Sequence, residues 1–192
     1  MSQAPEQPKY GTQLFMVRDS LSLLPPLQLP EGYTLRGFLP GDEQAWELIM
    51  KESFLSEFSF AAHMRADKEY LAERVLFVCH EGRPVATASA WFREVYGDAT
   101  GYVHMVGALP GHGGKGLGYI VSLAALYQMK EEGRTRAVLH TDDGRLPAVA
   151  TYLKLGFVPQ LAASDHEQRW EEVAVQLGGR QIRCNPANGS EA

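Results

Sequence analysis

Apolar and polar positions follow two different periods along the chain, which predicts a fold that contains both strands and helices. Short β-prone runs, several of them bounded by glycine or proline, lie at residues 33–36, 75–79, 85–92, 102–109, 136–140 and 157–158. Apolar residues recur at helical spacing in residues 42–50, 116–132, 147–155 and 164–177, and less regularly in 67–74. The order of these segments predicts an α/β (α+β) fold with a mixed central sheet flanked by helices.

The chain divides into three parts on this pattern. Residues 1–30 are predicted to form an N-terminal arm, in which residues 13–17 add an edge strand ahead of a proline-containing connector. Residues 31–161 form the core, and residues 162–192 supply an amphipathic helix and a tail. Asp42 is expected to cap the first helix, and Ser164 with Glu167 has the pattern of a capping box. Both ends, residues 1–10 and 185–192, are expected to fray.

Composition limits the class of protein. A chain of 192 residues with 45% hydrophobic residues can bury one substantial core, and no apolar run is long enough to span a membrane. The first residues lack the pattern of a signal peptide, and only Cys79 and Cys184 are cysteines, so we expect a protein of the reducing cytoplasm. The net charge of -5 argues against nucleic acid as a partner. No metal is expected, because the histidines lack ligand spacing. The oligomeric state stays open, a homodimer included.

The most informative segment is a strand that runs through a glycine-dense turn straight into a helix. The first N–H groups of a helix have no partner within the helix, and the helix dipole is positive there, so an anion such as phosphate is stabilised at this point. Glycines let a ligand oxygen approach the main chain, and Lys115 can add a charge. The segment contains Val106, Gly107, Ala108, Gly113, Gly114, Lys115, Gly116, Leu117 and Gly118.

Three phosphate-binding patterns compete for this loop, beside a plain flexible turn. A P-loop requires Gly-Lys-Ser/Thr, whereas Leu117 follows Gly116, so that pattern fails. The dinucleotide pattern G-x-G-x-x-G is matched by Gly111, Gly113 and Gly116, but too little chain follows for a doubly wound fold.

The third pattern covers most of the chain and resembles the GNAT superfamily of N-acetyltransferases. Pro110 precedes the loop Gly-Gly-Lys-Gly-Leu-Gly at residues 113–118, and residues 148–157 read Ala-x-x-x-Tyr-x-x-x-Gly-Phe. The resemblance implies a sheet that splays at the acetyl-CoA site, with pantetheine between the strands that end at Ala108 and His140. The acceptor would enter from the opposite side of the sheet.

Three positions depart from the family pattern. Gly113 stands where the family usually has Arg or Gln, and Ala108 replaces the usual Val. Arg145 stands where an Asn often contacts the cofactor, and it is expected to restore some positive charge. These departures keep a non-catalytic acyl-CoA-binding or sensor module open as an alternative to an enzyme, and the literal glycine pattern keeps an NAD-dependent oxidoreductase open as a third.

Direct acetyl transfer to an amine needs an oxyanion site, a proton donor for the thiolate and a proton acceptor for the amine. The resemblance assigns the oxyanion to a main-chain N–H of residues 106–108 and the acid to Tyr152. A phenol with a pKa of about 10 stays protonated at neutral pH and can donate to a thiolate. His104 is the candidate base, because strand alternation would put it on the face of Val106 and Ala108 and its reference pKa is near 6.5.

Other candidates are weaker. His140 and Asp142 are reserve bases, ahead of Glu94. Cys79 is expected to be a packed core thiol, not a nucleophile. An aromatic acceptor pocket and simple core packing both remain open for a set of aromatic residues, which comprises Phe54, Phe58, Phe60, Trp91 and Phe92. The sequence therefore predicts an acetyl-CoA-dependent acyltransferase whose acceptor amine, a small molecule or a protein, is not identified.

Overall fold

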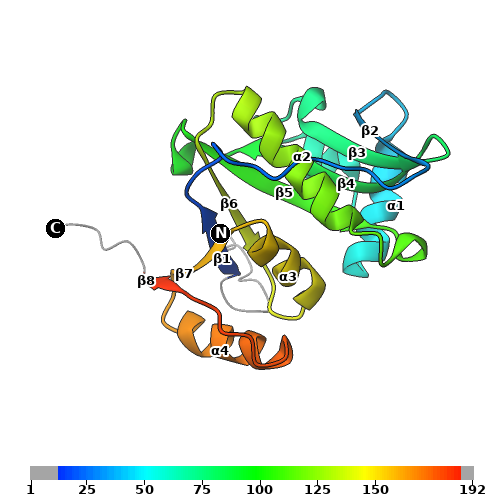
Figure 1. Cartoon of the computed structure of the whole chain (residues 1–192). Coiled ribbons are helices and arrows are strands. Elements are labelled where there is room, and N and C mark those ends of the chain that lie inside the picture. Colours follow the sequence, from blue (N-terminus) through cyan, green and yellow to red (C-terminus); the bar gives the residue numbers. More distant parts are fainter. Residues whose placement is uncertain (1–12, 187–192) are drawn as a thin grey trace, which may run out of the picture.

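A computed structural model describes residues 13–186 of the chain. Its longer helices are α1 (Glu43–Phe54), α2 (Leu117–Glu131), α3 (Leu146–Lys154) and α4 (His166–Gln176). The strands are β1 (Leu14–Arg18), β2 (Tyr33–Gly37), β3 (Val75–His80), β4 (Arg83–Phe92), β5 (Thr100–Ala108), β6 (Arg136–Thr141), β7 (Val158–Leu161) and β8 (Asn185–Pro186). This order of strands and helices confirms the predicted α/β fold (Figure 1).

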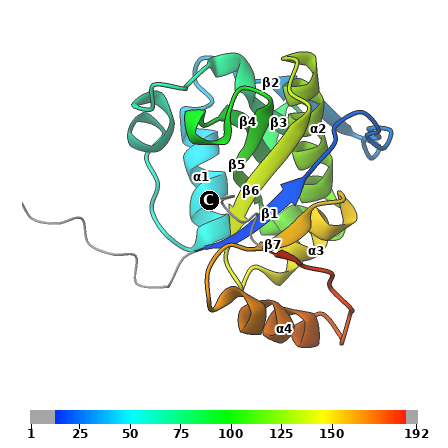
Figure 2. The same ribbon diagram turned by 90° about the vertical axis from the view of Figure 1, so that its left-hand side faces the viewer.

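All eight strands form one mixed sheet in the order β2-β3-β4-β5-β6-β1-β7-β8. Neighbouring strands are antiparallel except for β5 with β6 and β7 with β8, which are parallel. Helix α1 covers one face of the sheet, and α2 lies on the opposite face (Figure 2). Helix α4 packs beside β7 at the far end of the sheet.

Each face of the sheet has its own hydrophobic core. On the α1 face, Trp46, Ile49 and Met50 of the helix are fully buried with Phe77 and Trp91 of the sheet. The apolar positions of α2 form the centre of the larger core on the other face, which includes Val121, Leu123, Ala125 and Leu126. The helical spacing of these residues is what directs them to the sheet.

The predicted edge strand is wrong in its position. Strand β1 lies inside the sheet, antiparallel to β6 on one side and to β7 on the other. Leu14 and Met16 are fully buried and Val17 is 4% exposed, so both faces of the strand are covered. A strand that buries side chains on both faces is typical of the interior of a sheet.

The parallel pair β5 and β6 is paired over only part of its length. Residues 100–102 of β5 lie opposite residues 136–138 of β6. Beyond them, β5 and β6 do not pair with each other within the described chain. Beyond this point β6 remains paired with β1 as far as Thr141, while β5 remains paired with β4 as far as Ala108. The sheet therefore splays between β5 and β6.

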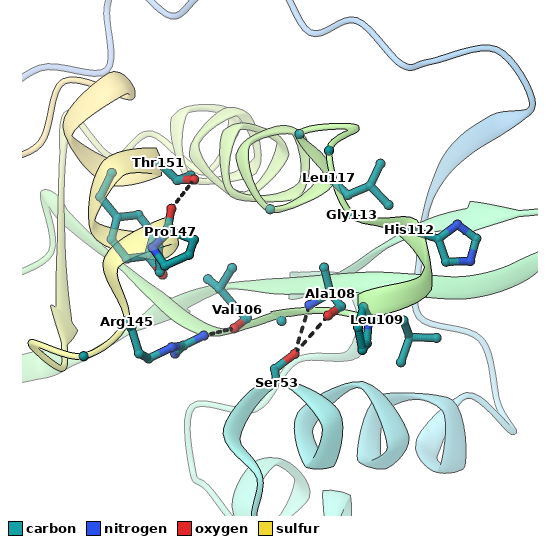
Figure 3. Close-up of a pocket in the computed structure, with 18 residues that line it drawn as sticks. Ser53, Val106, Ala108, Leu109, His112, Gly113, Leu117, Arg145, Pro147 and Thr151 are labelled. Atoms are coloured by element: carbon teal, nitrogen blue, oxygen red, sulfur yellow. Dashed lines mark hydrogen bonds between the residues drawn. The ribbon is translucent and has the colours of Figure 1, made fainter. Parts of the chain in front are cut away.

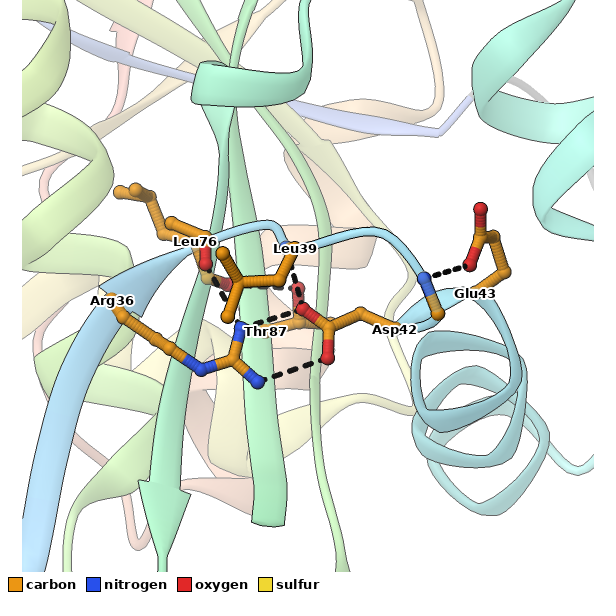
Figure 4. Close-up of polar contacts among 8 residues, drawn as sticks. Arg36, Leu39, Asp42, Glu43, Leu76 and Thr87 are labelled. Atoms are coloured by element: carbon orange, nitrogen blue, oxygen red, sulfur yellow. Dashed lines mark hydrogen bonds and ion pairs between the residues drawn. The ribbon is translucent and has the colours of Figure 1, made fainter. Parts of the chain in front are cut away.

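The entry to α1 is stabilised by an ion pair instead of a helix cap. Asp42 is at the N-cap position, but its side chain accepts a hydrogen bond from the Leu39 N–H at 2.7 Å and pairs with both terminal nitrogens of Arg36 (Figure 4). The predicted capping by Asp42 is therefore wrong, since the carboxylate holds the preceding turn onto β2. This bidentate pair lowers the pKa of Asp42.

Several smaller predictions are also corrected. The predicted helix over residues 67–74 is wrong: the segment forms turns and a short 3₁₀ helix (Ala72–Arg74). The Asp67 carboxylate stabilises the turn, because it accepts a hydrogen bond from the Glu69 N–H and forms an ion pair with Arg93. Helix α4 starts after Asp165 without a side-chain cap, so the capping box does not form. Asn185 and Pro186 pair with β7 and do not fray, whereas residues 1–12 and 187–192 lie outside the described part. No described helix is long and apolar enough to cross a membrane.

Candidate active site

A cavity of about 610 Å³ opens where β5 and β6 diverge. It lies between the end of β5 (residues 106–109), the glycine loop (residues 112–118) and the start of α3 (residues 144–152), and we call it the loop cavity (Figure 3). Its volume is typical of cavities that hold a cofactor or a drug-sized ligand. All predicted site residues except His104 and Lys115 line it; Lys115 is exposed to solvent.

The glycine loop has room for an anion at its main chain. Gly114 and Gly116 have φ of +76° and +69°, a left-handed conformation that favours glycine. A Cβ placed on Gly114, Gly116 or Gly118 would meet no atom within 4 Å, so the loop leaves space on its cavity side. Helix α2 starts after Gly116 without a side-chain cap, and its first N–H groups are available. These features fit the pyrophosphate of acetyl-CoA.

The loop is also tied to the sheet by a histidine. The Tyr33 hydroxyl lies 2.7 Å from Nδ1 of His112, which lines the loop cavity. The His80 ring packs against both rings, with ring centroids at 4.7 Å from Tyr33 and 5.2 Å from His112. These contacts hold the first half of the loop against the ends of β2 and β3.

Main-chain groups of β5 point into the splay. The Val106 carbonyl accepts a hydrogen bond from Nη2 of Arg145 at 3.1 Å, and the Ala108 N–H donates to Oγ of Ser53 at 3.0 Å (Figure 3). Gly107 makes this approach of α1 feasible, because a Cβ there would lie 2.6 Å from both Met50 and Ser53. The end of β5 is therefore held by contacts from the last turn of α1 and from the start of α3.

A bulge in β5 changes which residues share a face. Ser89 of β4 lies opposite His104 but Thr87 lies opposite Gly107, so β5 has one extra residue, and Met105 has φ of +49°. Val106 packs in the α2-side core. The His104 ring instead contacts Trp91 of the α1-side core at a centroid distance of 5.3 Å. The predicted common face of His104, Val106 and Ala108 is therefore wrong, because the bulge interrupts strand alternation.

His104 lines a second cavity of about 300 Å³, which we call the histidine cavity. Its lining comes from residues 102–106 of β5, from residues 140–142 of β6 and the turn after it, from Phe54 at the end of α1 and Phe58 beyond that helix, and from Gln13. It shares Val106, Arg145 and Tyr152 with the loop cavity, so the two cavities meet at the splay. The cavity thus brings His104 together with the reserve candidates His140 and Asp142.

Burial favours the uncharged forms of His104, His140 and Tyr152 around the junction. Burial, with a smaller effect of Arg93, lowers the pKa of His104 to about 4, and burial also lowers that of His140. Burial raises the pKa of Tyr152 to about 12, although the charge of Arg145 opposes the shift. The structure thus contradicts the expected histidine pKa near 6.5. His104 is neutral at pH 7 but is a weaker base than predicted.

The aromatic residues and cysteines singled out from the sequence lie in different environments. Phe54 and Phe58 line the histidine cavity, whereas Phe60 and Trp91 are fully buried core residues. Cys79 is 1% exposed, as expected for a packed thiol, and both cysteines are free. The described residues contain no group of three or more metal-ligating side chains.

Sequence reasoning missed Ser53 and Tyr102. Ser53 lies in an ordinary amphipathic helix, and nothing in its local sequence marks it as the partner of Ala108. The Tyr102 ring packs against both histidines, with centroid distances of 5.4 Å to His104 and 5.8 Å to His140, and burial raises the pKa of Tyr102 to about 12. Its position two residues before His104 was the available signal.

Comparisons with known proteins agree with this architecture. A mycothiol acetyltransferase from Pseudarthrobacter chlorophenolicus is 34% identical over 145 residues, which are 70% of this chain and 45% of that protein. Another from Frankia alni is 32% identical over 183 residues, 84% of this chain and 54% of that protein. The chain therefore spans about half the length of the curated relatives it matches.

Solved structures show the same fold. A GCN5-related N-acetyltransferase from Sphaerobacter thermophilus superposes with a TM-score of 0.61 and 23% identity, covering 78% of this chain and 50% of that one. The ribosomal-protein-S18-alanine N-acetyltransferase from Escherichia coli superposes with a TM-score of 0.54 and 18% identity, covering 65% of this chain and 76% of that one.

The splayed mixed sheet and the glycine-rich start of α2 place the chain in the α/β class. The chain belongs to the acetyltransferase (GNAT) family, whose model matches residues 43–157. This confirms the resemblance drawn from the loop and from residues 148–157. The dinucleotide-binding alternative is wrong, because β4 and β5 are antiparallel and the sheet is not doubly wound.

The geometry of the loop predicts how substitutions affect acetyl-CoA binding. Gly116→Val should abolish measurable binding, because a β-branched residue disfavours the left-handed conformation and fills the cavity side of the loop. Lys115→Ala should weaken binding only about two- to fivefold, as for an exposed charge. Titration calorimetry with acetyl-CoA measures both. Gly111→Val is the matched control, because Gly111 does not line the cavity. Equal affinity of Gly116→Val and wild type would refute this placement of the cofactor.

The lowered pKa of His104 predicts a pH-dependent stability. The unfolded chain binds a proton at this histidine near pH 6.5, and the folded chain does so only near pH 4, so stability falls as the pH falls through this window. Relative to His104→Gln, the wild type should lose up to about 3 kcal/mol between pH 6.5 and 4. Urea unfolding at a series of pH values measures this difference. Parallel stability curves for the two proteins would contradict the assigned pKa.

Proposed function

We propose that this protein transfers an acetyl group from acetyl-CoA to a primary amine by direct attack. The observation that carries the proposal is that two cavities, one lined by the glycine loop and the other by His104, share Val106, Arg145 and Tyr152. A donor thioester in one cavity and an amine in the other would meet at these residues. Membership of the GNAT family and relatives named mycothiol acetyltransferase support the same reaction. Both free cysteines agree with a reducing compartment such as the cytoplasm.

In the donor site, the main chain of the glycine loop and the start of α2 would hold the pyrophosphate, while the gap between β5 and β6 would take the pantetheine. Bound acetyl-CoA supplies the activated acetyl group as a thioester. Gly113 offers no side-chain donor at the position where the family usually has one, so binding depends on the N–H groups of the loop. Arg145 lies at the junction, 3.1 Å from the Val106 carbonyl, and adds a positive charge there.

The reaction forms a bond between the amine nitrogen and the acetyl carbon and breaks the bond between that carbon and sulfur. Negative charge develops on the acetyl oxygen, and we assign its stabilisation to the main chain of residues 106–108. The Ala108 N–H already has Ser53 as its partner, and Gly107 lies in register with Thr87 of β4. The N–H of Val106, whose carbonyl points into the splay, is therefore the best-placed donor.

Tyr152 is proposed as the acid that protonates the departing thiolate. It is 3% exposed and lines both cavities, and its raised pKa keeps it protonated at neutral pH. The same burial raises the pKa of a thiol that leaves into this junction, so the pKa of the phenol and the pKa of the leaving thiol stay close to each other. Proton transfer from the phenol then accompanies cleavage of the carbon–sulfur bond.

His104 is proposed to accept the proton of the amine, directly or through water. A pKa of about 4 makes it too weak a base to deprotonate a free ammonium group whose pKa is near 10. It can accept the proton once the nitrogen has begun to bond to carbon, when the N–H becomes much more acidic. Asp142 and His140 line the same cavity and remain the reserve bases.

A thiol-release assay with acetyl-CoA and a panel of primary amines tests this function. Tyr152→Phe keeps the packing volume but removes the proton donor, so kcat should fall on the order of 10²-fold while the acetyl-CoA affinity changes little. Tyr127→Phe is the matched control, because its hydroxyl donates to the Pro25 carbonyl outside both cavities. If kcat of Tyr152→Phe is unchanged when the chemical step limits the rate, Tyr152 is not the acid and has only a structural role. Acetyl-CoA binding without thiol release for any amine would instead favour a non-catalytic acyl-CoA-binding module.

A further inference from the structure

The histidine cavity contains two opposite charges that are not paired with each other. Asp142 and Arg145 both line it and both are half-buried. The Arg145 N–H donates to the Asp142 carbonyl at 3.1 Å, so the two residues sit at the ends of one tight turn. Among the described residues, however, no ion pair links their side chains, although neighbouring Asp143 is paired with Arg169. A cavity that presents a separate cation and anion is complementary to a ligand that carries both charges.

Arg145 has the features of a binding site for a carboxylate. No described carboxylate lies within ion-pair distance of its guanidinium. Within residues 13–186, the guanidinium donates to the Val106 carbonyl at 3.1 Å and lies 3.9 Å from the centroid of the Phe54 ring, and both partners are neutral. These two contacts fix the plane of the guanidinium and leave further N–H donors for a ligand. A half-buried cation without an anionic partner is costly, and a bidentate carboxylate would offset that cost.

Asp142 and the aromatic wall supply the remaining recognition groups. Nε2 of Gln13 donates to one Asp142 oxygen at 3.1 Å, which orients the carboxylate. Phe54 and Phe58 line the same cavity with their ring centroids 5.3 Å apart, and Met105 is also part of the lining. An ammonium group and an apolar side chain therefore each have a partner within one small cavity.

We propose that the acceptor is an α-amino acid with an apolar or aromatic side chain, whose carboxylate binds Arg145 while its amine lies between Asp142 and the splay. This inference rests on the proposed acetyl transfer and adds the substrate class. The cavity volume of about 300 Å³ suits a ligand of this size. Arg145 also lines the loop cavity. The same guanidinium would therefore bind an acyl donor that ends in a carboxylate, such as succinyl-CoA, and the assay must distinguish the two ligands.

The wild-type protein tests the proposal with matched acceptors in the thiol-release assay. L-phenylalanine and phenethylamine differ only in the carboxylate, and phenylalaninamide keeps the size without the charge. With acetyl-CoA, kcat/KM for L-phenylalanine should exceed that for either analogue without a carboxylate on the order of 10- to 100-fold, the range for a hydrogen bond to a charged group. Equal or faster reaction of phenethylamine would overturn the proposal. So would a preference for succinyl-CoA with phenethylamine over acetyl-CoA with L-phenylalanine.

Variants then assign the effect to Arg145. In Arg145→Gln the ratio of kcat/KM between L-phenylalanine and phenethylamine should collapse to about one, and Arg145→Lys should retain part of it. Arg136→Gln is the matched control, because Arg136 lies at the opposite end of β6 and pairs with Asp19. An unchanged ratio in Arg145→Gln would overturn the assignment.

Calorimetry separates this inference from the proposed function. L-phenylalanine should bind wild type in the presence of CoA and bind Arg145→Gln at least about tenfold more weakly. If no amine releases thiol but this difference in affinity persists, the acetyl transfer is wrong and the amino-acid site stands. If amines are turned over but L-phenylalanine neither binds nor reacts preferentially, the amino-acid site is wrong and the acetyl transfer stands.

Discussion

The divergence of β5 from β6 is the constraint on which the remaining structure depends. Two parallel strands that pair over only three residues leave main-chain groups of β5 without a neighbouring strand, and such groups need other partners. Ser53 supplies one of them from the last turn of α1, and Arg145 supplies the other from the start of α3. The gap is therefore held open by specific contacts, and both cavities exist because of it.

The bulge at Met105 gives this gap two different sides. Without the extra residue, alternation would place the side chains of His104 and Val106 on one face of β5. The bulge instead directs His104 toward the α1 face, where Tyr102 and Trp91 pack against it. Bulges near active sites commonly re-aim a side chain in this way. Burial on that face then determines the electrostatics, because it keeps the histidine neutral and the nearby phenols protonated.

Much of the fold and part of the site could be predicted from the sequence, and there is a physical reason why the remaining features could not. The glycine loop, α2 and the segment around Tyr152 were predictable because local backbone geometry and helical periodicity leave clear patterns. The interior position of β1 was not predictable, because a short apolar run does not indicate which strands it pairs with. The roles of Ser53 and Arg145 depend on contacts across 55 and 39 positions of the chain, and the bulge depends on the register of β4. Such long-range pairings leave no local signal.

The most direct test of the account is a crystal structure of the protein with bound CoA. The account predicts that the pantetheine lies between β5 and β6, that the pyrophosphate contacts the N–H groups of residues 113–118, and that the sulfur lies within hydrogen-bonding reach of the Tyr152 hydroxyl. Binding of CoA outside the splay, or a sulfur remote from Tyr152 with the β5–β6 gap empty, would contradict it.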